Sequence, residues 1–255
     1  MVKRRSARTG AVGRLKVRPE SGDGLIPRTL EFIRSQLPAW RDDPQRPQAP
    51  NEKTSNSSLS DYLDVKSRSL HPMVRFKHEA TQASGHSVDI GVHGTSEVTW
   101  IEAHPYSLYE PFMVIEAKRL PAPSNDRERE YVSGPNEKDA KVTGGIQRFK
   151  LGLHGGGVDS AAMVGYVEAH SEQYWRDKIN AWITALVGIK CHDGATWAAS
   201  EVLQEFSRDE LSGVVSATSI HGRHGSSRSD EISIHHLFIN MTSARASEKA
   251  ACQKS

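Results

Sequence analysis

The sequence predicts an α/β protein in which a mixed central β-sheet lies between helices. Two observations carry this prediction: apolar residues recur at helical spacing in four segments, and they alternate with polar residues in several others. In chain order the segments read helix, helix, three strands, helix, strand, helix and a closing pair of strands, which is typical of an α/β sandwich. A length of 255 residues suits one large domain, or one domain with extensions.

Two amphipathic helices are expected first. Apolar positions three or four residues apart predict a helix over residues 27–40, although Pro38 allows an earlier end because proline disrupts a helix interior. A proline-rich linker follows, and residues 51–56 lead into a second helix. The apolar positions of the two helices are Leu30, Ile33, Leu37, Trp40, Leu59, Tyr62 and Leu63.

Three strands are expected next, because the apolar period changes from that of a helix to two. Residues 74–80 and 88–92 alternate between apolar and polar side chains and predict half-exposed strands. Residues 111–118 form a nearly continuous apolar run, which is typical of a more buried strand.

A polar loop over residues 121–138 precedes the second half of the chain. Apolar residues at helical spacing then predict a helix capped by Asp139 and ended by three consecutive glycines, 155–157. The later segments are a strand over 162–167, a helix capped by Ser171, and two closing strands over 214–220 and 232–239.

Charge is unevenly distributed along the chain. The formal net charge is only +2, but residues 1–20 carry seven basic groups and one acidic group. Residues 21–240 hold 23 basic and 29 acidic groups, so a mildly acidic body has basic ends. We therefore predict a basic, disordered arm over 1–23, a single domain over 24–240 and a polar tail over 241–255.

No membrane-spanning segment is expected. The longest apolar stretch, residues 181–189, is far shorter than the ~20 residues that cross a bilayer, and the basic N-terminus lacks the apolar part of a secretory signal. The two cysteines, Cys191 and Cys252, form neither a disulfide framework nor a zinc motif. These features predict a cytoplasmic protein.

Candidate catalytic residues lie on the second and third predicted strands. Asp89 is a polar position of one strand, and Glu116 and Lys118 lie two residues apart on the next, so both point to the same face. If the two strands pair, Asp89 and Glu116 share a cation, and oxygen donors of this kind suit Mg²⁺ or Mn²⁺. The backbone carbonyl of Ala117 is a further candidate ligand.

Such a set of residues suits phosphodiester hydrolysis. A metal neutralises charge on the phosphate and lowers the pKa of an attacking water, while an ammonium such as that of Lys118 orients the water. An isolated Glu-x-Lys pair is most often a solvated surface pair. The preceding strand with its aspartate, and the apolar run that leads directly into Glu116, favour the catalytic interpretation.

The pattern over residues 50–190 resembles the PD-(D/E)xK, or restriction-endonuclease-like, nuclease superfamily. The match places Asp89, Glu116 and Lys118 on its motif, Gln147 on the following helix, and Glu52 where some members place an acid that assists the metal; the proline before the first acid is replaced by Val88. The resemblance implies a restriction-endonuclease-like three-layer sandwich and a Mg²⁺-dependent nuclease, more readily of DNA than of RNA. It also implies a small stand-alone bacterial protein with a role in defence.

Two other functions stay open. One is a non-catalytic nucleic-acid-binding or assembly subunit with the same fold, and the other is a nuclease that stays inactive until a protein partner, a homo-oligomer or a signal activates it. The basic arm is a candidate contact to nucleic acid. Four further candidates lie in the body of the chain, namely Arg119, Lys150, His221 and Arg223. A zinc site is a weaker alternative, built from His221, His224, His235 and His236.

Overall fold

A computed structural model describes residues 24–47, 51–81, 85–138, 140–224 and 227–242. The basic arm over 1–23 and most of the tail lie outside the described residues. The helices are α1 (Leu25–Arg41), α2 (Glu52–Leu70), α3 (Gly145–Lys150) and α4 (Glu172–Leu186), with short 3₁₀ helices η1 (Asn125–Tyr131) and η2 (Ala199–Glu201). The strands are β1 (Val74–Thr81), β2 (Ser87–Gly94), β3 (Val98–Ile101), β4 (His104–Ser107), β5 (Met113–Leu120), β6 (Ser160–Val167), β7 (Gln204–Arg208), β8 (Val215–Gly222) and β9 (Glu231–Asn240).

Seven strands form one mixed sheet in the order β1-β2-β5-β6-β9-β8-β7. The pairs β5–β6 and β6–β9 are parallel, and the pairs toward both edges are antiparallel. The prediction of an α/β fold with a mixed sheet is therefore confirmed. Strands β3 and β4 form a separate two-stranded hairpin.

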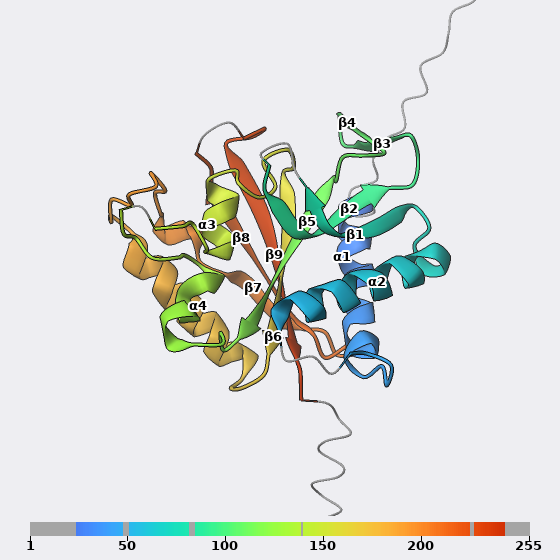
Figure 1. The fold of residues 1–255 in the computed structure, drawn as a ribbon, viewed down its shortest axis with the longest axis horizontal. Coiled ribbons are helices and arrows are strands. Elements are labelled where there is room, and N and C mark those ends of the chain that lie inside the picture. The colour runs from blue at the N-terminus through green and yellow to red at the C-terminus, as the bar shows by residue number, and fades with distance from the viewer. Residues whose placement is uncertain (1–23, 48–50, 82–84, 139, 225–226, 243–255) are drawn as a thin grey trace, which may run out of the picture.

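Helices cover both faces of the sheet (Figure 1). On one face, the Tyr166 hydroxyl of β6 donates to Asn56 of α2 at 3.0 Å, and its ring packs on Trp40 of α1. On the other face, Met163 of β6 lies against α3, where a Cβ on Gly145 would approach its methyl group to 2.6 Å. The odd and even positions of β6 thus face different helices, which is compatible with a three-layer sandwich.

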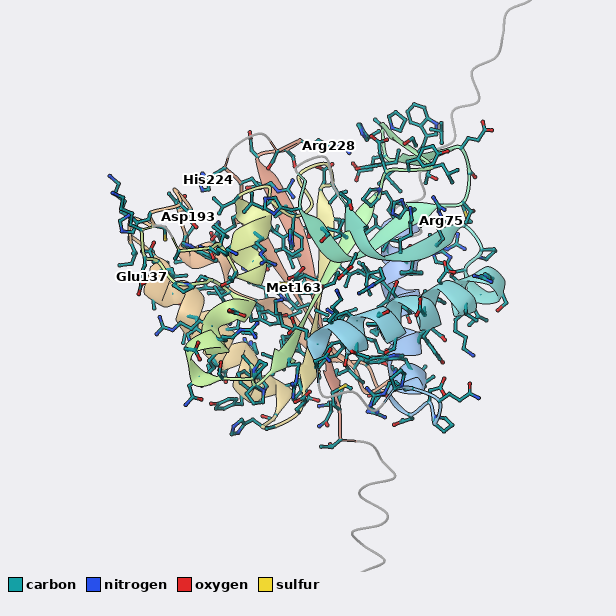
Figure 2. The ribbon with its side chains drawn as sticks, in the orientation of Figure 1. Arg75, Glu137, Met163, Asp193, His224 and Arg228 are labelled. Atoms are coloured by element: carbon teal, nitrogen blue, oxygen red, sulfur yellow. The ribbon has the colours of Figure 1, made fainter. Side chains whose placement is uncertain are left out.

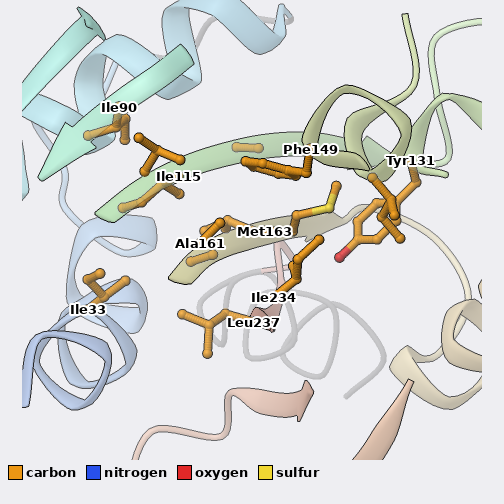
Figure 3. Close-up of a cluster of buried hydrophobic side chains, with 14 of the residues drawn as sticks. Ile33, Ile90, Ile115, Tyr131, Phe149, Ala161, Met163, Ile234 and Leu237 are labelled. Carbon is orange, nitrogen blue, oxygen red and sulfur yellow. The ribbon is translucent and has the colours of Figure 1, made fainter. Parts of the chain in front are cut away.

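The core lies on both faces of the central strands. All eight residues of β6 are buried, as expected for a strand with a strand on each side and helices above and below. Figure 3 shows Ile90, Ile115 and Met163 of three adjacent strands, with Phe149 of α3 on one side and Ile33 of α1 on the other. Each such side chain contributes ~1.5–3 kcal/mol to stability through burial, so the central strands hold the sheet together.

Helix α3 differs most from its prediction. The expected helix ran from Asp139, which lies outside the described residues, to Leu153, whereas α3 spans only Gly145–Lys150. The chain passes so close to another segment before this helix that a Cβ on Gly144 would lie 2.3 Å from the Cα of Ser133. This close approach fixes the start of the helix, and turns replace its predicted end.

The sequence pattern also missed five short elements, which are β3, β4, β7, η1 and η2. The β3–β4 hairpin has only four residues in each strand, and β7 is an edge strand whose residues are mostly exposed, so neither carries a clear apolar alternation. The predicted polar loop over 121–138 contains η1. The other helices and strands lie where they were expected, α1 continues through Pro38, and Ser171 caps α4. No helix among the described residues is long and apolar enough to cross a bilayer.

Candidate active site

The candidate site lies where the sheet splits between β2 and β5. These strands pair in antiparallel fashion, but only from Ile90 opposite Ile115 to Val92 opposite Met113. The N-terminal part of β2 stays paired with β1 as far as Ser87, so it separates from β5. The backbone groups of β5 beyond Ile115 therefore need other partners on this side.

Two carboxylates take the place of the missing strand. Asp89 Oδ2 accepts a hydrogen bond of 2.8 Å from the Ala117 backbone N–H, and Glu52 Oε2 accepts one of 3.2 Å from the Arg119 N–H. Glu52 reaches β5 because it is the first residue of α2, whose cap Asn51 accepts the Thr54 N–H at 2.8 Å. The split thus places two acidic side chains along one edge of β5.

Lys118 is the cationic centre of the site. Its Nζ lies 2.9 Å from Glu116 Oε1 and 3.1 Å from Glu52 Oε1. The structure therefore brings together four of the predicted residues, which come from β2, β5 and the start of α2. These residues are Asp89, Glu116, Lys118 and Glu52.

Glu116 has two further neighbours that the sequence did not reveal. Arg148 Nη1 lies 3.5 Å from Glu116 Oε1, and His154 Nδ1 lies 3.1 Å from Oε2. The His154 nitrogen is close enough for an ion pair but off the line of a well-formed hydrogen bond, so both buried atoms keep unused bonding capacity. His154 follows α3 in the turn that the sequence marked only as a helix stop.

The two central carboxylates titrate differently. Burial, and then the negative charge of Glu116, raise the pKa of Asp89 to about 7. Burial also disfavours the charged form of Glu116, but Lys118 and His154 outweigh it and hold the pKa of Glu116 below its ordinary value. The charges of Glu116 and Glu52 overcome burial and raise the pKa of Lys118. Near neutral pH the site holds an ionised glutamate, an ammonium and an aspartate that readily loses its proton.

Gln147 has a different position from the one expected. Its Oε1 accepts the Gly134 N–H at 2.7 Å, and its Nε2 donates to Asp193 at 2.5 Å, so it ties loops together away from the carboxylates. Arg148, the next residue of α3, is the one that reaches Glu116. We therefore correct the assignment of Gln147 to the site, because a helix turns by about 100° per residue and the two side chains point in different directions.

Three of the predicted nucleic-acid contacts are buried, which removes them from that role. Lys150 is fully buried and pairs with Glu201, and His221 is fully buried with its Nε2 2.8 Å from Ser219 Oγ. Arg223 donates to the carbonyls of Val158 and Gly155 at 2.9 and 2.6 Å. The fourth, Arg119, is partly exposed and forms a two-pronged pair with Glu168.

The donors at the split suit a hard divalent cation. Glu116 Oε2 is a buried oxygen donor and Asp89 is a half-buried one, and the Ala117 carbonyl points to the same side of β5 as the Ala117 N–H bound by Asp89. Mg²⁺ uses one or two carboxylates and keeps several waters, so this set fits it or Mn²⁺. Both Glu52 oxygens accept hydrogen bonds, from Lys118 and from the Arg119 N–H, so Glu52 is a partner of Lys118, and its role as a metal ligand stays a prediction.

A site of the kind that binds zinc is not present in the described ranges. Over these residues no group of three or more His, Cys, Asp or Glu side chains is placed to hold a metal ion. The weaker zinc alternative, from His221, His224, His235 and His236, is therefore not supported. The proposed ligands Asp89 and Glu116 are only two such side chains. Together with the Ala117 carbonyl they suit a magnesium site better than a zinc site.

Comparisons of the chain with protein families, with curated proteins and with solved structures gave no match.

Proposed function

We propose that this protein is a metal-dependent nuclease that hydrolyses phosphodiester bonds, with DNA favoured over RNA as its substrate. One observation carries the proposal: at the split between β2 and β5, Asp89 accepts the backbone N–H of Ala117, which lies between Glu116 and Lys118, and those two side chains pair at 2.9 Å. The ionised form of Asp89 is unfavourable beside Glu116 even with Lys118 nearby, as the raised pKa of Asp89 indicates. Strongly shifted pKa values of this kind are concentrated at functional sites of proteins.

The side chains divide the chemistry between them. Asp89, Glu116 and the Ala117 carbonyl would hold Mg²⁺ or Mn²⁺, which when bound neutralises phosphate charge and lowers the pKa of a bound water. Lys118 is held by Glu116 and Glu52 and orients the attacking water. Arg148 keeps 28% of its side chain exposed beside Glu116 and is placed to contact a phosphate oxygen.

The test is cleavage of a supercoiled plasmid by the purified chain with Mg²⁺. Glu116→Gln and Lys118→Met should each reduce the rate at least ~100-fold, since each removes a charge that acts on the transition state. Glu168→Gln is the matched control, because Glu168 also pairs with a cation but at the surface next to Arg119. Thermal unfolding of each variant separates loss of activity from loss of fold.

Undiminished cleavage in both site variants would contradict the proposal. Mn²⁺ titration by calorimetry distinguishes the alternatives. DNA binding without Mn²⁺ binding would favour a non-catalytic subunit, whereas Mn²⁺ binding without cleavage would favour a nuclease that needs an activating partner.

A further inference from the structure

A cleft of about 830 Å³ opens beside the candidate active site. It lies between the loop that follows the β3–β4 hairpin, the turn after α3 and the segment that contains Arg228, which Figure 2 labels at the upper edge of the molecule near the hairpin. Its volume is within the range of about 300–1,000 Å³ that is usual for small-molecule sites. The cleft is therefore large enough for one or more nucleotide-sized groups.

Several residues that line the cleft are close in sequence to the candidate catalytic residues. Val114, which lines it, precedes Glu116 by two residues on β5. Leu153 and Gly155 also line it, and they flank His154, whose Nδ1 lies 3.1 Å from Glu116 Oε2. A base bound in the cleft would therefore lie about 7 Å along β5 from Glu116, within the reach of one nucleotide.

Flat side chains dominate the hairpin side of the cleft. Tyr109 lines it and is 80% exposed, an unusual degree of exposure for an aromatic side chain. The guanidinium of Arg228 lies over the ring of buried Tyr106, 5.4 Å from its centroid, and the edge-to-face contact of His104 holds the same ring. Arg228 keeps 27% of its side chain exposed, so a fixed cationic plane faces the opening.

The two charged side chains that line the cleft, Glu110 and Arg228, already have hydrogen-bond or ion-pair partners. Arg228 forms an ion pair of 3.0 Å with Asp159, and Glu110 accepts the Ser107 N–H at 3.0 Å. One guanidinium and one carboxylate do not form a site for a phosphate, which takes an excess of donors and positive charge. The cleft instead offers planar surfaces, and across from them the bare backbone of Gly156 and Gly157.

We propose that this cleft binds an unpaired nucleobase of the strand that is cut, stacked on Tyr109 and the Arg228 plane. The substrate class is then single-stranded nucleic acid, or a duplex with an unpaired stretch, because bases within a duplex expose no face for stacking. This inference rests on the nuclease function proposed above and adds the form of its substrate. It assigns no sequence preference, since every base has a face that stacks.

The test measures binding without cleavage. Fluorescence anisotropy with a labelled oligothymidylate of eight residues, in EDTA, should give a Kd that rises about tenfold in Tyr109→Ala, the loss of one base stack, or ~1.4 kcal/mol. Tyr174→Ala on α4 is the matched control, because that tyrosine is also exposed and lies outside the cleft lining. Tyr174→Ala should bind as the unchanged chain does.

Two competitors identify what the cleft recognises. A blunt duplex of eight base pairs and free AMP should each compete at least tenfold more weakly than the unlabelled oligonucleotide. An unchanged Kd in Tyr109→Ala, or equal competition by the duplex, would overturn the inference even if plasmid cleavage is observed. Equal competition by AMP would contradict the binding of a nucleic-acid strand and would indicate a free nucleotide as the ligand. Selective binding of the oligonucleotide, lost in Tyr109→Ala, would support this site even if no cleavage is found.

Discussion

Replacing Asp89 with asparagine should stabilise the metal-free protein and at the same time abolish metal binding. The asparagine side chain would keep an oxygen to accept the Ala117 N–H, the bond of 2.8 Å that joins the side chain to β5. The change removes the negative charge of Asp89, which is unfavourable in the folded protein because the side chain is desolvated and faces the charge of Glu116, the two causes that raise its pKa. A residue that serves function at a cost in stability is expected to behave in this way.

The size of the effect follows from the pKa of Asp89. The folded protein binds more protons than the unfolded chain between 3.8 and about 7, so its stability falls as the pH rises through this range. At ~1.4 kcal/mol for each pH unit, the ionised side chain costs ~4 kcal/mol at pH 8 and ~1 kcal/mol at pH 4.5. Asp89→Asn should therefore gain ~4 kcal/mol at pH 8, or ~8–16 °C in Tm for a domain of this size.

Urea unfolding in EDTA at the two pH values measures this gain. Asp64→Asn is the matched control, because Asp64 also accepts a backbone N–H, from Phe76 at 3.2 Å, but its carboxylate pairs with Arg68. That variant should show no gain that grows with pH. Addition of Mg²⁺ at pH 8 should stabilise the unchanged protein and leave Asp89→Asn unaffected.

An Asp89→Asn variant that is destabilised equally at both pH values would refute the electrostatic reasoning. The side chain would then matter for its shape and hydrogen bond alone, and the adjacent carboxylates would not repel each other.

Three further predictions concern the elements that support the site. Asn51→Ala should lower the free energy of unfolding by ~1 kcal/mol through loss of the α2 cap, and should slow plasmid cleavage because α2 begins with the residue that holds Lys118. Lys150→Met should cost ~3–5 kcal/mol in urea unfolding, because it leaves Glu201 buried without its cation, and replacing both with apolar residues should recover much of the loss. Gly144→Ala should cost at least ~1–3 kcal/mol in a thermal scan, because its Cβ meets backbone, whereas Gly157→Ala, which has open space, should change Tm little.

Local pattern was sufficient for most of the fold. The helical stripes of α1, α2 and α4 and the alternation of β1 and β2 reflect burial of one face, and this leaves a period in the sequence that needs no knowledge of neighbours. The same reasoning placed Glu116 and Lys118 on one face of β5. In the structure, Lys118 Nζ lies 2.9 Å from Glu116 Oε1. The β3–β4 hairpin and β7 escaped because short, exposed strands bury too little to impose a period.

Only the tertiary structure decided which side chains complete the site and which do not. Arg148 and His154 reach Glu116, and Gln147 turns away, because Gly144 must pass within backbone contact of Ser133 and so sets the start of α3. Lys150, His221 and Arg223 look like exposed cations in the sequence, yet they are buried by partners distant along the chain. Thus the sequence by itself determined the fold class and the common face of Glu116 and Lys118, because these depend on periods within single elements. The approach of Asp89 to them depends on where β2 separates from β5. The remaining contacts depend on packing between segments, and that leaves no local period to read.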